Sequence, residues 1–232
     1  MKVAILQSNY IPWKGYFDII NAVDLFVFYD DVQYTTRDWR NRNRIKTPNG
    51  TKWLTVPVDG TRSKRICDVN ICNDNWQQKH FKSIVMNYSK AKYFKSYISF
   101  FEEIYLNNVW EKLSEFNQYF IKRIYTDILK NSGTEFKSSC DFNLSGTKEA
   151  RLLELLKKCS ATEYLSGPSA KSYINEANFL KDGIKVIWMD YNNYPEYSQL
   201  YPPFNHFVSI IDLIFNTGPN ANKYMKGRSG KL

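Results

Sequence analysis

Polar side chains that could bind a ligand follow the first two apolar runs of the chain. These runs, residues 3–6 (VAIL) and 25–29 (LFVFY), have the length and composition of buried strands. The polar residues after them are Gln7, Asn9 and Tyr10 for the first run, and Asp30, Asp31 and Gln33 for the second. Amides, hydroxyls and carboxylates bind sugar hydroxyls and amines, and a carboxylate can also accept a proton. We therefore predict a small-molecule site at these two strand ends.

The adjacent carboxylates Asp30 and Asp31 are the first candidates for a catalytic role. Neighbouring residues of a strand point to opposite faces, so the two cannot act as a paired-carboxylate dyad. We expect one of them to orient or deprotonate a substrate amine. The two histidines, His80 and His206, are further catalytic candidates. His80 lies on the apolar side of its expected helix, so the alternative to a catalytic role is a packed, hydrogen-bonded side chain.

A concentrated positive charge follows the second apolar run. Residues 37–65 contain nine basic and two acidic side chains, which supply +7 of the net charge of +9. If the segment is extended, Arg40 and Arg42 share one face and Asn41 lies on the other. We predict that these three residues bind phosphate, because a guanidinium group donates two parallel hydrogen bonds. The alternative is an exposed strand whose charges face solvent.

The elements that would position these residues alternate between strand and helix. Residues 14–23 have helical spacing, and with the two apolar runs they make a unit of the size of a parallel crossover. Trp13, where this helix starts, is predicted to form a wall of the site. Lys14, the next residue, is predicted to contact phosphate. Strand and helix alternate again in residues 145–189. We therefore predict an α/β fold with a Rossmann-like, doubly wound, mostly parallel sheet, in which ligands bind beyond the carboxyl ends of the strands.

A long helical stretch interrupts this alternation. From residue 75 to residue 131 the apolar side chains follow helical spacing. No linker bounds the stretch, so we predict one α/β domain over residues 1–232 with a helical insertion at 75–131. The basic residues after Gly218 are expected to form a mobile tail.

Composition excludes several classes of protein. The four cysteines have no metal-ligand spacing and only two histidines accompany them, so we predict no metal site. No segment approaches 18 uninterrupted apolar residues, and the start MKVAILQ reads as a strand, so we expect a cytoplasmic protein without a membrane span. Neither a P-loop nor a glycine-rich dinucleotide fingerprint occurs, so the sequence identifies no cofactor.

Several motifs of the chain resemble those of one known family. They are QSNYIPWKGYFD at 7–18, DDVQY at 30–34, WRNRNRIK at 39–46, WLTVPV at 53–58, YLSG at 164–167 and SIIDLIFNTG at 209–218. Together they resemble the WbqC-like family over nearly the whole chain. Members of that family are associated with bacterial O-antigen and related polysaccharide gene clusters, so the resemblance implies a role in surface polysaccharide or lipopolysaccharide biosynthesis.

Three functions are open at this point. The first, which we favour, is amide-forming acyl or aminoacyl transfer to a nucleotide-linked amino sugar, with the arginines holding the phosphates of this anionic small molecule. In the second, the basic segment binds a charged tRNA as aminoacyl donor, or ATP drives the ligation. The stretch Pro12–Gly15 is placed like the triphosphate loop of adenylating synthetases but lacks their histidines. The third is a non-catalytic binding subunit of a polysaccharide assembly complex.

Overall fold

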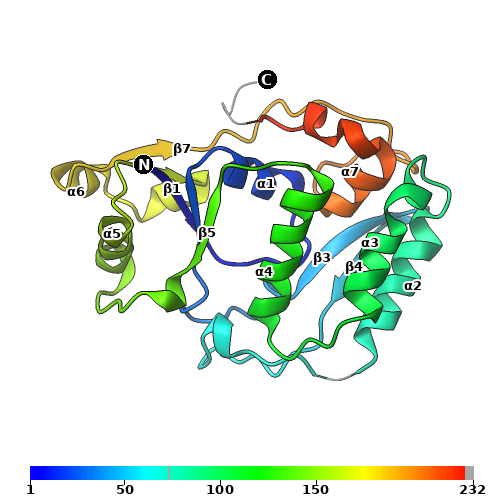
Figure 1. Cartoon of the computed structure of the whole chain (residues 1–232), viewed down its shortest axis with the longest axis horizontal. Helices are drawn as coiled ribbons and strands as arrows, with labels where there is room; N and C mark the ends of the chain where they lie inside the picture. Colours follow the sequence, from blue (N-terminus) through cyan, green and yellow to red (C-terminus); the bar gives the residue numbers. More distant parts are fainter. Residues whose placement is uncertain (73, 228–232) are drawn as a thin grey trace.

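A five-stranded parallel sheet forms the centre of the structure, a computed structural model that describes residues 1–72 and 74–227 (Figure 1). Its strands, in spatial order, are β5 (Glu135–Ser138), β2 (Leu25–Phe28), β1 (Lys2–Leu6), β6 (Glu163–Ser166) and β7 (Lys185–Trp188). The chain runs outward from β1 through β2 to β5, and then returns to the other side of β1 for β6 and β7. All neighbouring strands are parallel. This doubly wound order confirms the predicted Rossmann-like α/β fold.

Helices cover both faces of the sheet. α1 (Lys14–Asn21) and α4 (Leu113–Arg123) pack on one face, and α5 (Lys148–Lys158) and α6 (Glu176–Lys181) pack on the other. Successive strand residues point alternately into the two apolar clusters, with Ala4, Phe26 and Phe28 on the first face and Val3, Ile5, Leu25 and Val27 on the second. Because both faces are buried, the strands appear in the sequence as uninterrupted apolar runs.

A large insertion connects β2 to β5. It begins with an antiparallel hairpin, β3 (Arg42–Thr47) and β4 (Gly50–Thr55), that forms a separate two-stranded sheet. α2 (Trp76–Tyr88), α3 (Phe94–Leu106), α4 and a π-helical turn at Ile124–Ile128 follow. Hairpin, helices and one face of the main sheet contribute to a single apolar cluster. The prediction of one domain over the whole chain therefore remains, with the insertion packed on the sheet.

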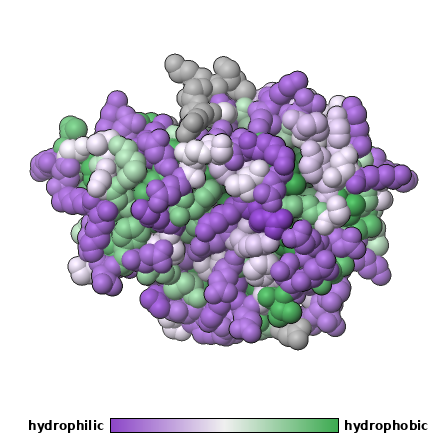
Figure 2. All heavy atoms as spheres, in the orientation of Figure 1, coloured by the Kyte–Doolittle hydropathy of each residue, from purple (hydrophilic) through white to green (hydrophobic). Residues whose placement is uncertain are grey.

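The C-terminal part of the chain closes the fold beside the hairpin. α7 (Ile210–Thr217) is almost wholly buried, and its Asp212 accepts hydrogen bonds from the hydroxyls of Tyr88 (3.0 Å) and Tyr197 (2.7 Å). The tail that was expected to be mobile is packed as far as residue 227. The backbone N–H of Lys226 donates to Asp18, and its Nζ contacts Asp190. Residues 228–232 of that tail lie outside the described residues. Figure 2 shows that hydrophilic side chains cover most of one face of the molecule, with apolar groups between them.

Candidate functional site

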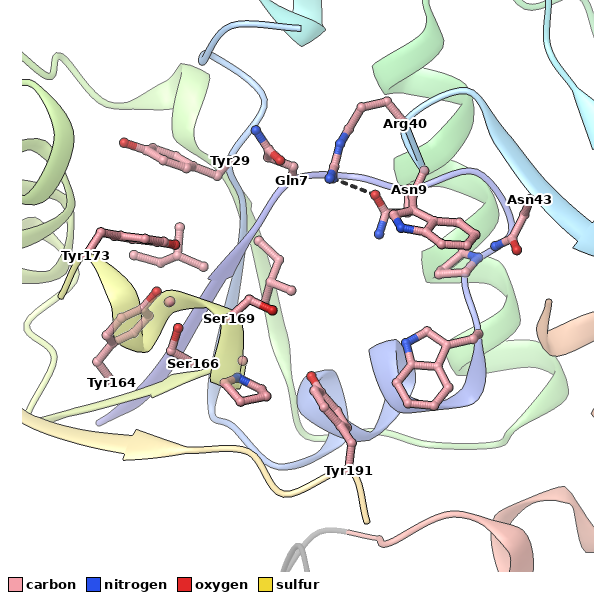
Figure 3. Close-up of a pocket in the computed structure, with 18 of the residues that line it drawn as sticks. Gln7, Asn9, Tyr29, Arg40, Asn43, Tyr164, Ser166, Ser169, Tyr173 and Tyr191 are labelled. Carbon is pink, nitrogen blue, oxygen red and sulfur yellow. Dashed lines mark hydrogen bonds between the residues drawn. The ribbon is translucent and has the colours of Figure 1, made fainter. Parts of the chain in front are cut away.

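A cavity of about 730 Å³ lies at the carboxyl ends of β1 and β6, where the direction of winding reverses (Figure 3). Doubly wound sheets bind their ligands at this position, and the volume is typical of small-molecule sites. The walls are largely aromatic, with Trp13, Tyr29, Trp39, Tyr164, Tyr173, Tyr191 and Phe207. The polar groups among the lining residues are Gln7, Asn9, Arg40, Asn43, Ser166 and Ser169.

The loop between β1 and α1 supplies one wall of the cavity. The hydroxyl of Tyr16 donates to the carbonyl of Gln7 (3.0 Å), which fixes the chain as it leaves β1. Trp13 precedes α1, and its indole packs so closely over Gly15 that a Cβ there would lie 2.3 Å from the ring. Its ring also meets that of Tyr191 edge-on, with centroids 5.2 Å apart. Glycine at position 15 therefore allows the indole to form this wall.

Arg40 is the one side chain with a formal charge among the described residues that line the cavity. One of its terminal nitrogens donates to Oδ1 of Asn9 (2.6 Å; Figure 3). The other lies 3.4 Å from a carboxylate oxygen of Asp38. The Nε atom of Arg40 is buried and has no hydrogen-bond partner in the described part of the chain. The guanidinium group is thus held in place by the protein at the cavity wall, where its positive charge suits an anionic ligand.

The opposite wall comes from β6 and the 3-10 turn that follows it, Pro168–Ser172. Ser166 and Ser169 contribute hydroxyls here, and Tyr164 and Tyr173 contribute rings (Figure 3). Burial raises the pKa of both tyrosines, so their phenols are neutral hydrogen-bonding groups at neutral pH. None of these four residues is among the site residues predicted from the sequence. The polar Ser-Gly-Pro stretch at the end of a predicted strand is the signal that could have found them.

Asp30 lies outside the cavity, although it follows β2. Its carboxylate is fully buried and accepts hydrogen bonds from the backbone N–H of Ser8 (2.8 Å), the hydroxyl of Ser114 and the amide of Gln118 (2.9 Å). These contacts fasten the loop after β1 to α4. Because protein groups already surround the carboxylate, this geometry assigns Asp30 a structural role.

Asp31, also beyond the end of β2, lies beside α5 and lines a second cavity of about 580 Å³. It forms an ion pair with Arg151 of α5 and accepts a hydrogen bond from the hydroxyl of Ser139. Tyr29 of the first cavity lies close to this ion pair: burial raises its pKa, and Arg151 opposes that shift. Tyr29 therefore lines the first cavity on the side that faces the Asp31–Arg151 pair. Gln33 lies farther away, where its amide donates to the carbonyl of Arg62.

The two histidines do not line the cavity. His80 is buried in α2, and its Nδ1 shares a hydrogen bond with the hydroxyl of Tyr10 (2.7 Å), which also contacts the hydroxyl of Tyr105 (2.6 Å). Burial lowers the pKa of His80 to about 4, so the imidazole is neutral at neutral pH. Tyr10 is fully buried in the same aromatic cluster. His206 is half-buried beside the ring of Phe204, and burial also lowers its pKa.

Two other predicted phosphate contacts, Lys14 and Asn41, are occupied by protein groups. Lys14 is buried, donates to the carbonyl of Pro195 (3.2 Å) and lies 4.6 Å from the centre of the Tyr194 ring. Burial lowers its pKa to about 8. The amide of Asn41 donates to the carbonyl of Val56 (2.9 Å). The structure thus brings Gln7, Asn9, Trp13 and Arg40 together at the cavity and places the remaining predicted residues elsewhere.

Within residues 1–72 and 74–227, no group of three or more His, Cys, Asp or Glu side chains is arranged to hold a metal ion. None of the helices in those residues is both long and apolar enough to cross a membrane.

Comparison with known proteins places the chain in a family. The model of the WbqC-like protein family matches residues 7–224. A relative from Mycobacterium tuberculosis, named "Uncharacterized protein Rv1507c", is 44% identical over 227 residues, which cover 97% of this chain and 97% of the relative. No solved structure matches the chain at a significant level. The chain belongs to the WbqC-like protein family.

Proposed function

We propose that the cavity binds a nucleotide-linked sugar and that the protein modifies this sugar in the biosynthesis of bacterial surface polysaccharide. The observation that carries this proposal is the anchored guanidinium group of Arg40 in an aromatic cavity at the point where the sheet reverses its winding. Nucleotide phosphates bind at this position in doubly wound sheets. Aromatic rings suit a base or a sugar face, and amides and hydroxyls suit sugar hydroxyls.

Three groups of cavity residues contact three different parts of the proposed ligand. Arg40, oriented by Asn9, holds the phosphates. Trp13 and Tyr191 form an aromatic corner for the base or the sugar ring. On the opposite wall, Ser166 and Ser169 bind hydroxyls of the ligand.

The reaction that we propose is amide formation at an amino group of the bound sugar. The amine nitrogen attacks the acyl carbon of an activated donor, the new C–N bond forms, and the bond from the acyl carbon to the leaving group breaks. The amine must lose a proton in this reaction. The leaving group takes up this proton as it departs, so that the step balances without a further base.

One observation favours a second candidate, a binding subunit without catalytic activity. Among the described residues that line the cavity there is no carboxylate and no imidazole. Incubation of the protein with a nucleotide-linked amino sugar and an acyl-CoA distinguishes the two functions. A product whose mass has increased by the acyl group supports the transferase, and tight binding without a product supports the binding subunit.

A thermal-shift screen with nucleotide-sugars, ATP and acyl-CoA tests the binding proposal. We expect a nucleotide-sugar to raise the melting temperature. Arg40→Lys keeps the charge but loses the planar fork, so it should weaken nucleotide-sugar binding by about tenfold. Arg42→Lys is the matched control, because Arg42 lies over the ring of Trp53 outside the cavity and its replacement should leave this binding unchanged. Equal affinity in the wild type and Arg40→Lys would contradict the proposal.

A further inference from the structure

The outer face of the β3–β4 hairpin carries two exposed tryptophans. Trp39, just before β3, is 40% exposed, and Trp53 of β4 is 41% exposed. Their ring centroids are 5.4 Å apart. The opposite face of the hairpin, with Ile45 and Leu54, is buried in the core. The hairpin is therefore anchored on its inner side and presents a pair of indoles on its outer side.

Two arginines lie on the same outer face. Arg42 and Arg44 alternate with buried Asn43 along β3, and Arg44 pairs with Trp53 across the two strands. Their guanidinium carbons lie 4.4 Å and 5.2 Å from the centre of the Trp53 ring. No carboxylate forms an ion pair with either arginine in the part of the chain that the structure describes, and within that part the buried Nε of each has no hydrogen-bond partner. We call Trp39, Arg42, Arg44 and Trp53 the Trp–Arg platform.

The platform continues directly into the cavity. Trp39 belongs to both, since it lines the cavity together with Arg40 and Asn43. Phe207, 65% exposed, lines the cavity as well. An elongated ligand bound along the platform would therefore reach the cavity with one of its ends.

We propose that the Trp–Arg platform binds the unpaired end of an RNA and directs it into the cavity. Unpaired bases stack on aromatic rings whatever their sequence, and arginines attract the phosphates between them. A duplex fits less well, because its bases already stack on one another and the major groove of RNA is too deep and narrow for a β-hairpin. An acidic peptide would pair with the arginines but would bring no ring to stack on the exposed indoles.

This inference rests on the proposed function and names the donor of the acyl group. An aminoacyl ester at the end of the RNA would lie at the cavity, next to the amine of the bound sugar. Attack of the amine forms the C–N bond and breaks the ester C–O bond. The electron pair of that bond leaves with the ribose oxygen, which takes up the proton released by the amine. No further reactant is needed.

Fluorescence anisotropy with a short fluorescein-labelled single-stranded RNA tests the inference, with the blunt duplex of the same sequence for comparison. We expect the wild type to prefer the single strand. Trp53→Ala should weaken binding of the single strand by about tenfold, and Trp53→Phe, which keeps a ring, should weaken it less. In the double variant Arg42→Ala/Arg44→Ala, the slope of log K against log salt should become shallower by about 1.4.

The matched control is Lys181→Ala/Lys185→Ala. It removes the same charge from α6 and β7, at the opposite end of the molecule from the hairpin (Figure 1). This variant should bind the single strand like the wild type. Three results would each overturn the inference. The control variant could lose as much RNA affinity as Arg42→Ala/Arg44→Ala, or the wild type could bind the duplex as tightly as the single strand. In the third, poly-glutamate displaces the RNA and Trp53→Ala binds RNA with wild-type affinity.

The thermal-shift assay separates this inference from the proposed function. Trp53→Ala should keep the wild-type response to nucleotide-sugar, because Trp53 does not line the cavity. If nucleotide-sugar binds and RNA does not, the RNA inference fails and the proposed function stands. If RNA binds and no nucleotide-sugar does, the proposed function fails.

Discussion

The carboxylate of Asp30 accepts hydrogen bonds from two elements that are far apart in the chain. Ser8 belongs to the loop after β1, and Ser114 and Gln118 belong to α4. A buried carboxylate with three donors stabilises the loop that forms one wall of the cavity. The sequence identified the residue type and the strand end, but whether a carboxylate faces a cavity or a neighbouring helix depends on packing between distant segments.

The first prediction concerns the stability that Asp30 supplies. In Asp30→Asn the side chain loses its charge and one acceptor oxygen, so one of its three donors has no partner. We expect the free energy of unfolding to fall by about 2–3 kcal/mol, measured by urea denaturation at neutral pH. Asp74→Asn is the control, because the ion pair of Asp74 with Lys79 is exposed and should contribute less than about 1 kcal/mol. Wild-type stability combined with lost activity would instead give Asp30 the catalytic role predicted from the sequence.

At the scale of elements, local spacing was sufficient for most helices and strands. The parallel pair β1 and β2, the crossover helix α1 and the helices within residues 75–131 all follow from apolar periodicity. The alternation of Arg42 with Asn43 also placed the arginine on the outer face of β3. Spacing did not show that the hairpin forms a separate sheet beside the cavity, because that position depends on contacts with α2 and α7, which come later in the chain.

The second prediction concerns the start of α1. An alanine Cβ at position 15 would lie 2.3 Å from the Trp13 indole, so Gly15→Ala must displace this ring from the cavity wall. We expect nucleotide-sugar affinity to fall about five- to tenfold, the size of one lost aromatic contact, measured by titration calorimetry. Trp13→Leu should cause a similar loss. The double variant should then show no further loss, and additive effects would contradict this explanation.

At the scale of the whole molecule, the predicted fold class was right, and four of the thirteen predicted site residues line the cavity. Gln7, Asn9, Trp13 and Arg40 meet at the cavity, whereas His80, Lys14 and Asn41 are engaged by protein groups. The residues at the cavity follow β1 or lie in the segment that approaches its end. Ser166 of β6 and Ser169 of the following turn come more than 120 residues later in the sequence and join them only because the winding of the sheet reverses at β1.

The last prediction concerns cooperativity of the whole chain. Ile45 of the hairpin, Ile84 of α2, Phe101 of α3 and Phe26 of the main sheet belong to one apolar cluster, so the insertion cannot detach without exposing the core of the sheet. We expect a single unfolding transition in urea, with far-UV circular dichroism and tryptophan fluorescence giving the same midpoint.

Two single-tryptophan variants follow the unfolding of the insertion and of the main sheet separately. One keeps only Trp110, next to α4, and reports on the insertion; the other keeps only Trp188 of β7 and reports on the far edge of the sheet. Within each variant, the fluorescence midpoint should coincide with the midpoint from circular dichroism, because both regions unfold with the shared core. A Trp110 transition at lower urea than the loss of circular dichroism would show that the insertion is a separate unit, and the chain would then comprise two domains.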